Sequence, residues 1–201
     1  MPLSKEEEKR LAKLYGEWSF NNAEDCALLN TAYEYEEDYF EDMTFKKDSL
    51  CYDIFFIADE RQNKFLDIES NYFRFFVIDD NGEIAGCTDL RERTISITRS
   101  NVKNKSVVLH EMIHAYERIL HDSNPILLEN IMLSLYLKLS PLIPDLDKRI
   151  KIHSELCGQQ ELARIGGYHG LTFFLKSLDL DIRCGYPLGT ICGYGRDSMN
   201  V

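Results

Sequence analysis

The sequence is short of positive charge. Lys and Arg number 23 against 34 Asp and Glu in 201 residues, which gives a formal net charge of −11. A protein this acidic repels a phosphate backbone unless its few cations lie together on one face. The composition therefore disfavours nucleic acid as a partner.

Long apolar runs and paired cysteines are also missing. No run approaches the roughly 18 apolar residues that a membrane span requires, and residues 1–8 contain no apolar core of signal-peptide length. The six cysteines are scattered, and no two are arranged as Cys-x-x-Cys. We therefore expect reduced thiols, a cytoplasmic location and no membrane partner.

The patterns of apolar residues predict one domain over residues 1–201 with three consecutive parts. Residues 1–45 are expected to hold N-terminal helices at about 4–19 and 24–42, the second one acidic. Residues 50–100 are expected to form a sheet, and residues 106–180 further helices. The expected strands are 52–57, 72–78 and 94–98, with a turn at Asp80-Asn81-Gly82, and the later helices begin near Ser106 (as N-cap), at Pro125, near 145 and, as a short helix, after Gly170. The fold class is therefore expected to be α+β, with a small, mostly antiparallel sheet packed on one of these helices.

The most informative stretch is His110-Glu111-Met112-Ile113-His114, inside the helix expected after Ser106. Residues four apart lie on one face of a helix, so the two imidazoles can bind one tetrahedral Zn²⁺. Glu111 is rotated by about 100° from His110 and can reach a metal-bound water as a general base. The alternative is a pair of core histidines that are hydrogen-bonded to backbone carbonyls, because this helix is apolar on most of its surface.

A catalytic zinc site needs a third protein ligand and an open position for water. We reject His121, because seven residues of unbroken helix place it about 10 Å beyond His114. The remaining candidates lie on the same helix, on later helices or between them: Glu117, Glu129, His153, Glu155, Glu161 and His169. Of these, His169 has glycines on both sides that allow close approach of the backbone, and it opens an apolar run.

Three segments, in this order, resemble the SprT-like zinc metallopeptidase family. Ala85-Gly86-Cys87-Thr88 and Thr94–Thr98 are similar to the family's small-residue strand and its Ile-rich edge strand. Val108–Tyr116 is very similar to the family's zinc helix. His169-Gly170-Leu171-Thr172-Phe173 is similar to the family's His-Gly-x-x-Phe element. Together the segments cover less than a quarter of the chain.

This resemblance implies a zincin-like fold that binds Zn²⁺ through His110, His114 and His169, with Glu111 as the catalytic general base. The chain departs from the family in three ways. Residues 115–168, 54 in number, separate the second and third histidines, so an inserted pair of helices must fold back. No Cys-x-x-Cys zinc ribbon follows, because seven residues lie between Cys184 and Cys192, and the family's basic character is missing.

The sequence therefore predicts a zinc-dependent metallopeptidase that hydrolyses protein or peptide substrates. Tyr116 and Tyr168 are candidates for stabilising the oxyanion, and packing is the alternative role for each. Two other functions remain open. One is a DNA-associated repair protease, which the family favours and the net charge disfavours; the other is a non-catalytic binding domain that zinc stabilises.

Overall fold

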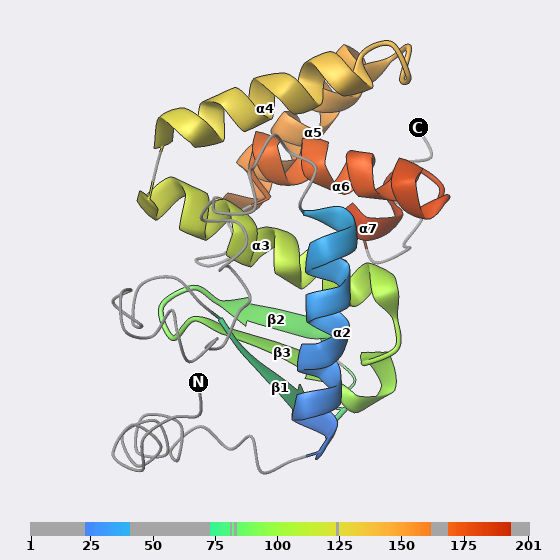
Figure 1. The fold of residues 1–201 in the computed structure, drawn as a ribbon. Coiled ribbons are helices and arrows are strands. Elements are labelled where there is room, and N and C mark those ends of the chain that lie inside the picture. Colours follow the sequence, from blue (N-terminus) through green and yellow to red (C-terminus); the bar gives the residue numbers. More distant parts are fainter. Residues whose placement is uncertain are drawn as a thin grey trace.

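The computed structural model describes residues 23–40, 73–80, 82, 84–123, 125–161 and 169–193 (Figure 1). Its helices and strands together define an α+β protein, as predicted. They are α2 (Ala23–Tyr39), β1 (Arg74–Ile78), β2 (Gly86–Asp89), β3 (Thr94–Thr98), the 3₁₀ turn η3 (Arg99–Asn101), α3 (Lys105–Ser123), α4 (Pro125–Leu139), α5 (Leu146–Glu161), α6 (Leu171–Cys184) and α7 (Thr190–Gly193). The helix predicted over 4–19 and the strand predicted over 52–57 lie outside the described residues.

The sheet has three described strands in the order β1-β3-β2, and their pairing is mixed where a mostly antiparallel sheet was predicted. β3 pairs antiparallel with β2 and parallel with β1, with Phe75 opposite Ile95. The chain between Ile78 and Gly86 is long enough to cross two strand spacings of about 5 Å each. β2 can therefore lie two strand positions away from β1, and β3 fills the position between them.

A tight turn returns the chain from β2 into β3. The Asp89 carboxylate accepts hydrogen bonds from the backbone N–H groups of Arg91 and Glu92, at 2.8 and 2.9 Å. Arg93 follows in the left-handed region, with φ of 51°. This arrangement closes the hairpin and leaves β2 with one sheet edge unpaired by any described strand.

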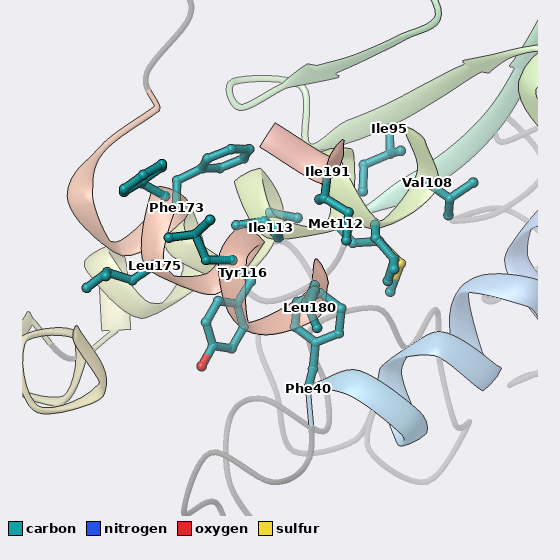
Figure 2. Packing of buried hydrophobic residues seen from close by; sticks show 14 of the residues in the cluster. Phe40, Ile95, Val108, Met112, Ile113, Tyr116, Phe173, Leu175, Leu180 and Ile191 are labelled. Atoms are coloured by element: carbon teal, nitrogen blue, oxygen red, sulfur yellow. The ribbon is translucent and has the colours of Figure 1, made fainter. Parts of the chain in front are cut away.

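Helix α3 lies between the sheet and a layer formed by α4, α5 and α6 (Figure 1). It is buried on most of its surface, as its sequence predicts, through nine apolar residues: Val107, Val108, Leu109, Met112, Ile113, Ala115, Tyr116, Ile119 and Leu120. Figure 2 shows part of this cluster, with the Tyr116 and Phe40 rings close together; their centroids are 5.4 Å apart. The helix begins at Lys105, so Ser106 lies in its first turn and is not its N-cap.

The long segment after α3 forms the helical pair that the 54-residue spacing predicts. α4 and α5 are consecutive helices, and both pack against α6. Lys138 of α4 forms an ion pair of 2.8 Å with Asp179 of α6. α6 has 14 residues and is buried from Thr172 to Asp181, so the prediction of a short helix here is wrong. It is long because helices cover it on several sides.

Helix α2 is the acidic helix that the sequence predicts, and it packs beside β1. The buried Asp25 carboxylate accepts a hydrogen bond of 2.7 Å from the N–H of Val77. At the other end of α2, the Tyr39 carbonyl accepts hydrogen bonds from Lys176 at 2.7 Å and Arg183 at 3.0 Å. These contacts join the N-terminal helix to the sheet and to α6. Within the described part of the chain, every helix is too short or too polar to cross a membrane.

Candidate metal centre

Three histidines from two separate segments of the chain meet at one point. His110 and His114 lie one turn apart on α3, and His169 comes two residues before α6 begins. One ring nitrogen of each lies within 4.8 Å of the others, and the Nε2 atoms of His169 and His110 are 3.2 Å apart. Two nitrogens on one tetrahedral Zn²⁺ lie about 3.3 Å apart. The group could therefore hold a metal ion.

The orientation of His110 is set by a backbone carbonyl. Its Nδ1 lies 2.8 Å from the oxygen of Ile191 in α7. A carbonyl can only accept, so Nδ1 carries the proton and donates it. In the neutral ring, Nε2 then has a free lone pair. That lone pair is at the end of the ring where His169 approaches, which is the arrangement that a metal ligand requires.

His153 of α5 holds the backbone of His169 through a hydrogen bond. His153 Nε2 lies 2.8 Å from the backbone oxygen of His169, and its ring stacks on Phe174 with centroids 4.2 Å apart. His153 was a candidate ligand, but the structure places it behind His169 and outside the group of three. It therefore fixes the backbone that carries His169.

Phe173 covers one side of the three imidazoles. Its ring centroid lies 4.4 Å from that of His169, 4.5 Å from that of His114 and 4.8 Å from that of His110. The first two ring pairs are inclined by 24° and 31°. This side of the centre is therefore lined by hydrocarbon, which excludes water and strengthens electrostatic interactions there.

Glu111, the residue after His110 on α3, is buried and is held by strand β2. Glu111 is 2% exposed, and its Oε2 accepts a hydrogen bond of 2.7 Å from Thr88 Oγ1. Gly86 leaves the room that Glu111 needs, since a Cβ there would lie 3.0 Å from Glu111 Cγ and Oε1. The carboxylate is thus fixed against β2, and Glu111 is not part of the three-histidine group.

Glu117 joins α3 to the start of α6. Its carboxylate accepts a hydrogen bond from the N–H of Phe173, and burial raises its pKa to about 7. Gly170 packs directly against it, because a Cβ at this position would lie 2.9 Å from Glu117 Oε1. Glu117 therefore fixes the segment that carries His169, a role that the sequence did not indicate.

The remaining candidate residues lie away from the group. His121, Glu129 and Glu155 are exposed on α3, α4 and α5. Tyr116 is fully buried in the core, which favours its packing role. The side chain of Glu161 and the whole of Tyr168 are outside the described residues. Among the side chains that the structure describes, Cys184 and Cys192 are not joined in a disulfide and do not belong to the three-histidine group.

In comparisons with known proteins, no protein-family model, curated protein or solved structure matches this chain. The geometry of the site and the three segments described above are therefore the basis for inferring its function.

Burial keeps the three imidazoles neutral. It lowers the pKa of His110 to about 3, that of His169 to about 4 and that of His114 well below the usual 6.5. Neighbouring histidines of the group lower the pKa values of His110 and His114 further. Neutral imidazole is the form that binds a metal. At neutral pH no proton therefore has to leave before an ion can bind.

We predict that His110 and His169 remain neutral in the metal-free protein at pH 5. The measurement is a ¹H–¹⁵N NMR titration of the imidazole nitrogens, with the urea-denatured protein, which should titrate near 6.5, as the control. Between these folded-state pKa values and about 6.5, the histidines bind protons in the unfolded state but not in the folded state. Each histidine's contribution to stability is therefore complete above about 6.5 and is lost as the pH falls toward about 4. Protonation of both rings near pH 6 in the folded protein would contradict this prediction.

Proposed function

We propose that this protein is a zinc-dependent metallopeptidase and a divergent relative of the SprT-like family. The observation that carries the proposal is the convergence of His110, His114 and His169, with the buried Glu111 next to His110 on α3. Three neutral imidazoles with a fourth position open suit Zn²⁺, and a carboxylate beside them suits hydrolysis. When bound, the ion would polarise the scissile carbonyl and lower the pKa of a water molecule.

Within this proposal, Glu111 moves the proton. Its carboxylate takes a proton from the attacking water and later delivers it to the nitrogen of the leaving amine. The hydrogen bond that Oε2 accepts from Thr88 orients the carboxylate for this proton transfer. Because the neighbouring β2 and Phe173 limit access of bulk water, this proton transfer takes place in a partly desolvated site.

The test of this function is zinc content together with peptide hydrolysis. We expect the purified protein to bind close to one Zn²⁺ per chain and to cleave a fluorescent, denatured casein. A chelator should remove the activity, and added Zn²⁺ should restore it. A protein that stays metal-free after zinc addition at neutral pH would contradict the proposal.

Two further results of this experiment are informative. Zinc binding without hydrolysis of any unfolded protein would indicate a zinc-stabilised binding domain. Hydrolysis that requires DNA, and that weakens steeply with salt, would indicate the DNA-associated form of the enzyme.

A further inference from the structure

Asp181 is a buried carboxylate on α6 that the proposed chemistry does not use. The residue is 0% exposed, and both of its oxygens accept hydrogen bonds from backbone N–H groups of the segment that follows α6. Oδ2 lies 2.6 Å from the nitrogen of Gly189, and Oδ1 lies 2.9 Å from the nitrogen of Ile191. The carboxylate therefore holds α7 against α6.

The same segment reaches the metal centre. Ile191 is fully buried, and its carbonyl accepts the hydrogen bond of 2.8 Å from His110 Nδ1. A single residue thus receives a hydrogen bond from the first histidine through its carbonyl and donates one to Asp181 through its N–H. The position of this carbonyl depends on where Asp181 holds the backbone.

We propose that Asp181 is a positioning residue that fixes the Ile191 carbonyl and thereby keeps His110 in the tautomer that leaves Nε2 free for the metal. This inference rests on the proposed zinc site. Its consequence is a tighter zinc site, since groups that orient a metal-binding histidine typically contribute about 10-fold to 100-fold in affinity.

An ionised carboxylate suits this role better than a neutral side chain does. It is acceptor-only, so both of its oxygens can face N–H groups, whereas an amide would place its own NH₂ against one of them. Burial is costly for such a group: it raises the pKa of Asp181 to about 6, although the N–H groups of Ile191 and Gly189 lower it. At neutral pH the carboxylate remains ionised.

Asp179 provides a matched control on the same helix. It is 1% exposed and ion-paired with Lys138 of α4 at 2.8 Å, so its replacement also disturbs a buried carboxylate. Asp179 lies outside the hydrogen bonds that connect α6, α7 and His110. A merely structural role for Asp181 should give Asp181→Asn and Asp179→Asn the same effects.

The experiment compares Asp181→Asn with Asp179→Asn by three measurements. These are the His110 tautomer in metal-free protein by long-range ¹H–¹⁵N NMR, the zinc Kd by competition with a chelator, and stability by urea unfolding. For Asp181→Asn we expect loss of the pure Nδ1–H tautomer and a zinc Kd that is about 10-fold to 100-fold higher. For Asp179→Asn we expect lower stability, an unchanged tautomer and a Kd within about 3-fold, the context-dependent scatter of such effects.

Three outcomes would overturn the inference: an Nε2–H tautomer of His110 in the parent protein, an unchanged tautomer in folded Asp181→Asn, or an equal Kd for the two variants. If Asp181→Asn does not fold, Asp181→Ser, which keeps one small acceptor, is measured in the same way. The tautomer requires neither zinc nor hydrolysis. Failure of the parent protein to bind zinc would therefore end the proposed function, while the tautomer still decides the role of Asp181.

Discussion

Glu111→Gln should lose at least about 100-fold in peptide hydrolysis, the usual effect of removing a general base. Glutamine has nearly the same shape and can still accept the hydrogen bond from Thr88, so the fold around β2 should persist. Its amide cannot take a proton from water at neutral pH. Zinc should remain bound, because Glu111 lies outside the three-histidine group.

The measurement is kcat/KM on a peptide substrate, with zinc content determined on the same samples. Glu129→Gln is the control, since Glu129 is an exposed glutamate on α4 and should keep parental activity. Equal turnover by Glu111→Gln and the parent protein would refute the role given to Glu111.

The second large effect concerns the third ligand. His169→Ala should weaken zinc binding by two orders of magnitude or more, roughly, because α3 alone offers two nitrogens and a stable site requires a third. The substitution also removes the ring that stacks on Phe173 at 4.4 Å. The loss should appear in the zinc Kd measured by chelator competition and, as a consequence, in activity.

Glu155→Ala is the control for this prediction. Glu155 is exposed on α5, and its replacement should leave the zinc Kd within a few-fold of the parent value. If His169→Ala binds zinc normally and a carboxylate variant at Glu129, Glu155 or Glu161 does not, the SprT-like proposal fails. A zincin with a glutamate ligand would then describe the protein better, with Glu111 still the base.

The helices near the site could be predicted well because their local signals agree. α3 has apolar residues on most of its surface, α4 begins at Pro125, and the His-x-x-x-His spacing places two rings on one face. The 54-residue interval also predicted a returning pair of helices, and α4 and α5 form it. For α3, for the start of α4 and for the two histidines on one face, the residues that determine the structure are close together in the sequence.

Other features depend on contacts between distant segments, and residue types do not reveal these contacts. The parallel pairing of β1 with β3 follows from where the chain crosses after Ile78, and the turn signal at Asp80 does not specify the crossing distance. Ile191 contributes a carbonyl, which every residue type has, so no pattern could indicate it. Thr88 belongs to the segment that resembles the family's small-residue strand. Its hydroxyl can donate a hydrogen bond to Glu111 only because β2 packs beside α3, and the sequence pattern does not specify that packing.

The interval between His114 and His169 has a thermodynamic consequence. A metal ion bound by both would close a loop through residues 115–168, and the entropy of closure grows only as the logarithm of loop length. Each doubling of the loop length costs about 0.6 kcal/mol in closure entropy. Including α4 and α5 in the loop therefore adds little to the free energy of closing it. The ion would then act as a cross-link. Its binding free energy would be shared with the packing of these two helices on α6, and metal affinity and the stability of the helical layer would rise and fall together.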